Sequence, residues 1–288
     1  MTKKLLALAA LLAFAVFITS CGKREEAGRK VRPAAPPKTA VKPAPKSVRP
    51  ARAKEAAIVI IIDDMGNNPK ELDDVLALPG PVAVAVLPLL RYSEETAKMA
   101  EKKGLTVLLH LPMQPKGHIK GLGPGRLMKG MSPKDINDIL SKDLASVPGA
   151  EGVNNHMGSL LTEDKAAMGA VMAGLKSRKL FFVDSLTTAG SEGWRMAEKA
   201  GVPFTRRDVF LDDLSDEAYI KAQFARLVAI AKKRGIAVAI GHPRPMTLKA
   251  LGEELPDLPK QGVRLVRVSE ALKGAGSGAN AVNSGPHK

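Results

Sequence analysis

Apolar runs of strand length recur through the middle of the chain and predict an alternating strand–helix domain. Eight such runs, rich in Val, Ile and Leu, lie within residues 56–272: Ala57–Ile62, Val82–Leu87, Leu105–Leu109, Gly152–Asn154, Leu180–Val183, Pro203–Thr205, Ile236–Ile240 and Val263–Val266. Unbroken apolar runs, rather than strict alternation, are typical of parallel strands that are buried on both faces. The pattern therefore predicts either a parallel (β/α) barrel or a doubly wound sheet.

Helical stretches fill the gaps between these runs, and three of them have a recognisable start. Ser93, Ser132 and Ser215 each precede acidic residues, and Pro133 follows the second of them. A capping hydroxyl before an acidic first turn, with proline at the first helical position, is typical of a helix N-terminus. In either predicted fold, functional side chains are expected at the carboxyl ends of the strands.

The first 22 residues have the pattern of an exported lipoprotein. Two lysines at positions 3 and 4 precede fourteen apolar residues, and Thr19-Ser20-Cys21-Gly22 follows. A charged start, a short apolar segment and small residues are typical of a secretory signal peptide. The apolar segment is shorter than the roughly 20 residues that a membrane-spanning helix needs. Residues 18–21 resemble the bacterial lipobox, in which Cys21 would receive diacylglycerol; the alternative is an ordinary signal peptide with an incidental cysteine.

The remaining segments outside the predicted domain have the composition of linkers. Residues 21–55 are rich in Pro, Lys and Ala without apolar periodicity, and residues 273–288 are rich in Gly, Ser, Ala and Asn. Such segments cannot bury enough apolar surface to offset the entropy of ordering, so we expect a disordered tether and a disordered tail. The chain thus divides into a signal peptide (1–20), a lipidated cysteine with its tether (21–55), a folded domain (56–272) and the tail. This organisation predicts a lipid-anchored protein on the periplasmic or another extracytoplasmic face of a bacterial envelope. Gly22, where an Asp is associated with inner-membrane retention, favours the outer membrane.

The charge distribution argues against a nucleic-acid-binding face on the domain. The chain has 44 Lys and Arg against 29 Asp and Glu, a net charge of +15. Positions 3 and 4 contribute +2 and residues 22–55 contribute +8, which leaves only +5 on the last 233 residues. Aromatic residues make up 3% of the chain, so platforms for base stacking are scarce as well. Because Cys21 is the single cysteine, the domain has no disulfide.

Polar side chains gather where the predicted strands end. Three of the five histidines do so: His110, His156 and His242. Together with Asp64, the first two form an Asp/His/His set, which on a divalent metal such as zinc leaves positions open for water. Two adjacent carboxylates, Asp63 and Asp64, suit one base and one ligand. Helix caps for the aspartates and buried core positions for the histidines are the structural alternatives, as is an ion pair between Asp184 and Arg206.

The motifs in the span from Ile58 to about Leu272 resemble those of the divergent polysaccharide deacetylases, relatives of the NodB-type carbohydrate esterases. They occur in the family's order: Ile62-Asp63-Asp64-Met65-Gly66, His110-Leu111-Pro112-Met113, Asn154-Asn155-His156-Met157-Gly158-Ser159, Phe182-Val183-Asp184-Ser185, Phe210-Leu211-Asp212-Asp213 and Gly241-His242-Pro243. The resemblance implies a distorted (β/α) barrel of the polysaccharide deacetylase type. It also implies that Asp63 is the catalytic base, Asp64 a metal ligand and His242 the catalytic acid.

One departure from that family concerns the metal ligands. Ordinary members take both metal-binding histidines from one His-x-x-x-His segment, whereas the residue four positions after His110 is Gln114. We therefore expect His156 to supply the second histidine ligand.

Together with these residues, the resemblance implies a metal-dependent N-deacetylase that acts on an envelope or extracellular polysaccharide, for instance a peptidoglycan-like glycan. Asp184 would orient or charge His242, while the side chains of Asn155, Arg206 and Asp213 would contact the sugar in an open cleft beside the loop 112–131. The alternatives are a non-catalytic module that binds a glycan or an envelope partner, and metal-assisted cleavage of another bond such as a peptide amide.

Overall fold

A nine-stranded parallel sheet forms the centre of the computed structural model, which describes residues 55–274. Strand β1 (Ala56–Met65) runs through its middle and is almost wholly buried. The other strands are β2 (Ala83–Val86), β3 (Thr106–Met113), β4 (Gly152–Met157), β5 (Phe181–Asp184), β6 (Phe204–Arg206), β7 (Val209–Phe210), β8 (Ile236–Gly241) and β9 (Val263–Leu265). All eight predicted strands are present.

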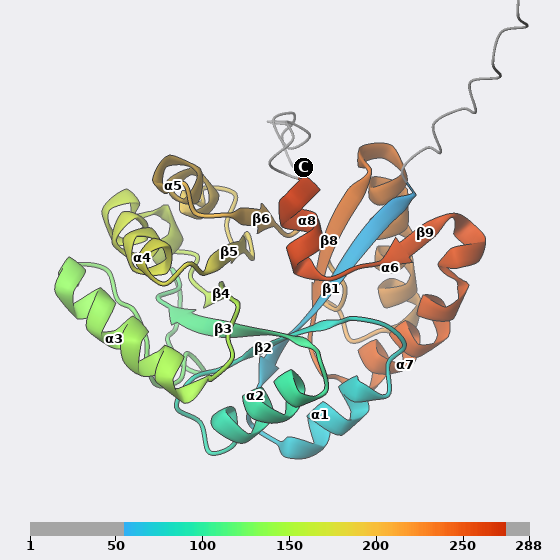
Figure 1. The fold of residues 1–288 in the computed structure, drawn as a ribbon, viewed down its shortest axis with the longest axis horizontal. Helices are drawn as coiled ribbons and strands as arrows, with labels where there is room; N and C mark the ends of the chain where they lie inside the picture. The colour runs from blue at the N-terminus through green and yellow to red at the C-terminus, as the bar shows by residue number, and fades with distance from the viewer. Residues whose placement is uncertain (1–54, 275–288) are drawn as a thin grey trace, which may run out of the picture. The chain divides into compact units, whose positions relative to one another are not determined.

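The strand order shows how the sheet closes. Its order is β6-β5-β4-β3-β2-β1-β8-β7, and β9 pairs separately with β1. β6 and β7 lie at opposite ends of this order although only Arg207 and Asp208 separate them, a reach of about 10 Å at most. The segment 204–210 pairs with β5 through its first half and with β8 through its second half. The sheet therefore curls into a distorted (β/α) barrel, as Figure 1 shows, and is not a doubly wound sheet.

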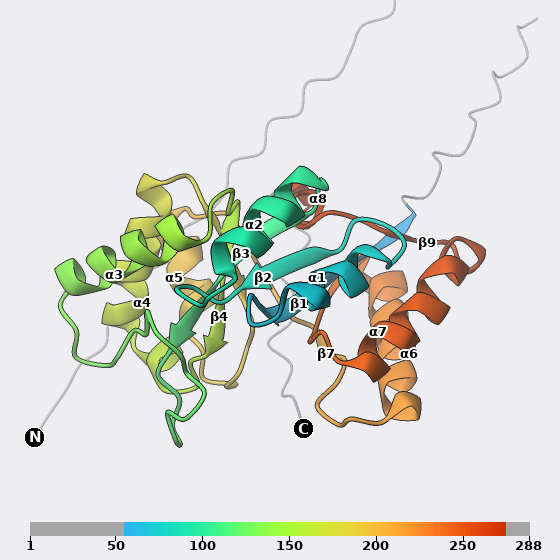
Figure 2. The same ribbon diagram turned by 90° about the horizontal axis from the view of Figure 1, so that it is seen from below.

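Helices cover the outside of the curled sheet (Figures 1 and 2). They are α1 (Pro69–Leu76), α2 (Ser93–Lys102), α3 (Pro133–Ser146), α4 (Lys165–Ser177), α5 (Gly193–Ala200), α6 (Glu217–Arg234) and α7 (Pro245–Glu254). Three short 3-10 helices, Leu161–Glu163, Leu255–Asp257 and Pro259–Gln261, join these elements. Among residues 55–274, no helix is both long and apolar enough to cross a bilayer.

Strand β1 shows why these runs are apolar throughout. Ile58, Ile60 and Ile62 belong to the large core between the sheet and the outer helices. Val59 and Ile61 alternate with them and belong to a second core in the barrel interior, to which α8 (Val268–Gly274) also contributes. Each face of a strand in such a barrel packs against apolar neighbours, so a polar residue is tolerated only near the strand ends.

The helix starts confirm one of the three capping predictions. The Ser132 hydroxyl accepts a hydrogen bond from Asp135 N (3.2 Å) and caps α3. Ser93 is instead the first residue of α2, and its hydroxyl bonds with the main chain of the preceding loop. The cap of α6 is Asp216, whose carboxylate accepts from Tyr219 N (2.7 Å), and not Ser215. A carboxylate one position further on is an equally good cap, and a pattern of residue types does not separate the two.

The remaining predictions about domain organisation concern mostly residues outside the described part of the chain. The signal peptide, Cys21 and nearly all of the tether lie there, as does the tail beyond Gly274. The last two residues of α8 extend into the segment predicted as the tail.

Candidate metal centre and active site

Asp63 and Asp64 lie where β1 departs from regular pairing. The register between β1 and β2 shifts between Ile62 and Met65, as in a β-bulge, and Asp64 has φ +60°. Such irregularities redirect side chains, and a left-handed conformation is costly for a residue other than glycine. The Asp63 side chain is buried (4% exposed), whereas that of Asp64 is about one-third exposed (34%). The local backbone thus gives two adjacent carboxylates different environments.

Three side-chain atoms converge beside this bulge. Asp64 Oδ1 lies 3.2 Å from His110 Nε2 and 3.1 Å from His156 Nδ1, and the two nitrogens are 3.1 Å apart. Donor atoms at about 2.0–2.1 Å from a tetrahedral zinc would be separated by about 3.3 Å. Asp64 Oδ1 is buried and accepts no well-aligned hydrogen bond from any described residue. The predicted trio Asp64, His110 and His156 is therefore brought together, and its geometry fits a divalent metal.

The outer nitrogen of each histidine has its own partner. His110 Nδ1 lies 2.8 Å from the Asn154 side-chain oxygen, and His156 Nε2 lies 3.3 Å from Gly121 O. Both partners are oxygen acceptors, so in the neutral form of each ring the outer nitrogen carries the proton and the inner nitrogen presents a lone pair. This arrangement is typical of metal-binding histidines, whose outer N–H is held by the surrounding protein.

Asn154 links the metal ligands to Asp63. Its side-chain amide donates to Asp63 Oδ1 (2.7 Å), while its oxygen accepts from His110. Asp63 Oδ2 lies 3.5 Å from His110 Nε2, so the predicted base is next to the predicted metal position. Asn154 was not among the predicted site residues. Its completely buried amide is the connection that the sequence analysis missed.

The charges of the cluster shift its pKa values in opposite directions. Burial raises the pKa of Asp63, against the opposing effects of His110 and of the Asn154 hydrogen bond. Burial also disfavours ionised Asp64, but the two neighbouring histidines outweigh it and hold the pKa of Asp64 well below its usual range. For His110, the carboxylates outweigh burial and raise the pKa to about 8. The adjacent aspartates thus differ as a base and a ligand should.

His242 approaches the same centre from the end of β8. Its Nε2 lies 3.8 Å from Asp64 Oδ2, and its Nδ1 lies 2.9 Å from Asp212 Oδ1. Asp212 Oδ2 accepts from His242 N and from the Thr247 hydroxyl, which fixes the carboxylate. Burial lowers the pKa of His242, but the hydrogen bond and charge of Asp212 raise it overall. His242 therefore has one restrained nitrogen, and its other nitrogen faces the metal donors.

Asp212, and not Asp184, is the carboxylate in contact with His242. Asp184 is completely buried; its oxygens accept from Leu186 N, the Ser191 hydroxyl and Trp194 N. These bonds hold the start of α5 and leave Asp184 without a direct role at His242. The sequence motif had offered Asp212 beside Asp213, but residue types alone do not show which of two neighbours faces inward.

The three predicted substrate-binding residues occupy different environments. Asn155 is buried, accepts from Ser185 N and donates to Met157 O, so both ends of its amide hold the strand ends together. Both polar atoms are thus engaged within the protein, and contact of Asn155 with a sugar stays a prediction. The Arg206 guanidinium lies 4.5 Å from the ring centre of Trp194, and Asp213 is exposed.

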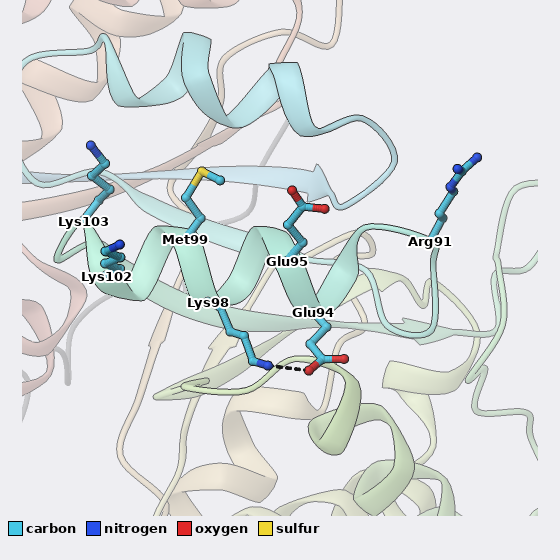
Figure 3. Close-up of a pocket in the computed structure, with 7 residues that line it drawn as sticks. All are labelled: Arg91, Glu94, Glu95, Lys98, Met99, Lys102 and Lys103. Atoms are coloured by element: carbon cyan, nitrogen blue, oxygen red, sulfur yellow. Dashed lines mark hydrogen bonds and ion pairs between the residues drawn. The ribbon is translucent and has the colours of Figure 1, made fainter.

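Gln114 lies outside the donor cluster, as expected. Its side-chain oxygen accepts from Lys129 N (2.8 Å) and fastens the segment between β3 and α3. Two surface hollows lie elsewhere. One of about 290 Å³ is lined in part by Arg244 and Thr247, both partners of Asp212. The other, of about 710 Å³, follows α2 and contains none of the predicted site residues (Figure 3).

Comparisons with known proteins agree with the geometry. A family model described as divergent polysaccharide deacetylase matches residues 60–272. The uncharacterized protein YibQ of Escherichia coli K12 is 39% identical over 215 residues, covering 75% of this chain and 67% of YibQ. An uncharacterized protein of Haemophilus influenzae is 37% identical over 206 residues, covering 72% of this chain and 73% of its own. The crystal structure of the uncharacterized protein ATU2773 from Agrobacterium tumefaciens C58 has the same fold, with a TM-score of 0.73 and 24% identity over 77% of this chain and 91% of that one.

Proposed function

This chain belongs to the divergent polysaccharide deacetylase family, and we propose that it is a metal-dependent N-deacetylase of an envelope polysaccharide. The observation that carries the proposal is the convergence of Asp64, His110 and His156 on one point, between buried Asp63 and His242. A site that only bound a metal would need neither a neighbouring base nor a restrained histidine opposite it.

The donor set indicates which ion would bind. One carboxylate and two imidazoles are ligands that zinc commonly uses, and three protein ligands leave a position for a reactant. Bound there, a divalent ion would supply Lewis acidity to the acetamido oxygen and increase the acidity of water. Asp64, His110 and His156 would hold it.

The two groups beside the donors have complementary tasks in amide hydrolysis. Asp63 takes a proton from water while the water oxygen bonds to the acetyl carbon. His242 then gives a proton to the sugar nitrogen as the carbon–nitrogen bond breaks, and the products are acetate and a free amino sugar. Asp212 restrains the His242 ring and favours its protonated form, so the acid is ready before the bond breaks.

The decisive experiment removes the base while keeping its shape. Asp63→Asn keeps the acceptor oxygen for Asn154 but cannot take a proton. We expect acetate release from N-acetylated chitin-like and peptidoglycan-like oligomers to fall by about 10²–10⁴-fold, the usual contribution of general acid–base catalysis. Metal content and thermal stability should stay close to those of the parent.

His156→Ala provides the metal control for this experiment. The side chain lies near the end of β4 and contributes little to the core, so the variant should fold yet lose stoichiometric metal. If the metal-loaded parent binds a glycan but releases no acetate from any oligomer, and Asp63→Asn binds equally well, the protein is a glycan-binding module and not a deacetylase.

We further propose that Cys21 anchors the domain to the membrane by lipidation, on the extracytoplasmic face of the envelope. The support is the sequence of residues 3–22 alone. Cys21→Ala should leave the membrane fraction or remain uncleaved. A normally processed Cys21→Ala protein that stays in the membrane fraction would rule out the lipid anchor.

A further inference from the structure

We propose that the segment 114–132, between β3 and α3, is a cationic lip that selects glycans carrying negative charges close to the scissile acetamido group. The inference rests on the proposed function, because it assigns a substrate class to the same site. The segment carries Lys116, Lys120, Arg126 and Lys129 and contains no acidic residue. It also holds His118 and lacks Phe, Tyr and Trp.

The lip is attached directly to the metal centre. Gly121 O lies 3.3 Å from Nε2 of His156, one of the three metal-binding candidates. Two further attachments are the bond from Leu127 N to Pro112 O (2.8 Å) and the bond from Lys116 N to the Ser159 hydroxyl (3.0 Å). Leu122 and Leu127 are completely buried. The backbone of the lip is therefore fixed beside the site, and in Figure 2 the segment extends beyond the ends of β3 and β4.

Among the described residues, most of the cationic side chains of the lip form no ion pair. Lys116 forms an ion pair with Glu163 (2.7 Å). Lys120, Arg126 and Lys129 are exposed, and none of them forms an ion pair within residues 55–274. In the part of the chain that the structure describes, the Arg126 guanidinium donates a hydrogen bond only to Gly123 O, at 3.5 Å. Because Lys120 is bonded to Gly121, the backbone that carries one of these cations is adjacent to the contact with His156.

The acidic groups around the site are distributed unevenly. Glu163, which faces the lip from the segment after β4, is already paired with Lys116. Asp143 of α3 lies beneath Gly125 and is buried. Exposed Asp213 follows β7, on the other side of β1 in the sheet order. The exposed cations of the lip would thus attract an anionic substituent on the β3 side of the site.

A carboxylate- or phosphate-bearing glycan matches this surface better than the other polyanions. Nucleic-acid sites that hold single strands combine cations with aromatic stacking platforms, and the lip has none. An anionic membrane would be met by cations together with exposed apolar side chains, of which the lip offers only Ile119 (44% exposed). The unpaired cations beside a fixed backbone fit discrete anionic groups on a polymer.

The test measures binding by metal-free protein, so that turnover plays no part. The parent should bind a carboxylated or a phosphorylated N-acetylated oligosaccharide about 5- to 20-fold more tightly than a neutral one of equal length at low salt, and the difference should shrink as salt is added. The triple variant Lys120→Gln, Arg126→Gln, Lys129→Gln should lose the difference. The matched control Lys142→Gln, Lys176→Gln, Lys199→Gln removes three exposed charges from the outer helices and should keep it.

Two results would overturn the proposal that the lip selects anionic glycans. One is equal affinity of the parent for charged and neutral oligomers; the other is an unchanged preference in the lip variant. Binding of the parent to anionic phospholipid vesicles without any preference among oligosaccharides would assign the cations to a membrane instead. In a further outcome, the parent prefers charged oligomers yet releases no acetate from any of them. That result would support charge selection by the lip and reject the proposed deacetylase activity, so the failures of the two proposals are distinguishable.

Discussion

At the scale of single residues, the site depends on two adjacent aspartates that lie in different environments. Asp63 and Asp64 have the same side chain, but the bulge in β1 buries the first and leaves the second partly exposed. Burial raises the pKa of Asp63, and the two histidines lower that of Asp64. A base needs a proton affinity above that of a permanent ligand, so the environment assigns the roles.

Asn154 connects the proposed base, Asp63, to the metal-binding candidate His110. It holds the His110 ring through one end of its amide and Asp63 through the other. Asn154→Ala should weaken zinc binding by about 10- to 100-fold, the usual effect of removing a partner of a metal-binding histidine. A competition titration with a chromophoric chelator measures it.

The control for that titration is Asn137→Ala, which removes an amide from α3 whose oxygen accepts a hydrogen bond from Arg178. It should leave zinc affinity unchanged. Equal affinities for Asn154→Ala and the parent would show that the His110 ring is held by packing alone.

Sequence patterns located the metal-binding candidates, but not the residues that support them. Asp64, His110 and His156 could be found because polar residues near the carboxyl ends of parallel strands meet at one edge of a sheet. Asn154 and Asp212 act through hydrogen bonds whose direction depends on side-chain rotation. Asn155 and Asp213, their immediate neighbours, fitted the sequence pattern equally well.

At the scale of elements, α3 and the lip meet at an unusual buried carboxylate. Asp143 is fully buried, and neither of its oxygens has a hydrogen-bond partner among the described residues. Burial raises its pKa to about 8. A Cβ atom at Gly125 would collide with this carboxylate, so the glycine allows the lip to lie against α3.

Asp143 should make stability depend on pH. Between about pH 4 and 8 the folded protein keeps a proton on Asp143 that the unfolded chain releases, so stability falls as pH rises through this window. Relative to Asp143→Asn, the parent should lose about 1.4 kcal/mol of unfolding free energy per pH unit, with no further change above about pH 8. Urea unfolding of both proteins across this range provides the measurement; a constant difference would mean that Asp143 is ionised in the folded protein.

The shortest elements were the least predictable from sequence. The eight strands of three or more residues coincide with apolar runs, because burial on both faces demands such runs. β7 is two residues long, and its Val209-Phe210 pair has no periodicity to recognise. The predicted caps at Ser93 and Ser215 were each displaced by one residue. The Ser93 hydroxyl bonds with the preceding loop instead, and Asp216 caps α6 in place of Ser215.

At the scale of the whole molecule, one segment decides between the two folds that the strand–helix alternation allowed. Residues 204–210 change partner from β5 to β8 within two residues, and this change closes the barrel. Closure arranges the ends of β1, β3, β4 and β8 around a common centre. In an open sheet these ends would lie in a row. Pairing between strands far apart in sequence leaves no local signal, so only the family resemblance favoured the barrel.

Arg207 stabilises the point where the pairing changes. Its guanidinium donates to Ser185 O (2.6 Å) and Leu186 O (2.8 Å) and lies 3.7 Å from the ring centre of Phe210. It therefore ties the end of β5 to β7 across the closure. Burial lowers its pKa to about 10, which still leaves it charged at neutral pH.

Arg207→Lys keeps the charge but removes the planar group that reaches both carbonyls. We expect a loss of about 1.5–3 kcal/mol of unfolding free energy, the usual contribution of hydrogen bonds to a charged group. The matched control is Arg206→Lys, because Arg206 stacks on Trp194 without bonding those carbonyls, and it should cost about 1 kcal/mol or less. Urea unfolding compares the two variants. Equal losses would show that the chain connection between β6 and β7 holds the barrel closed without help from Arg207.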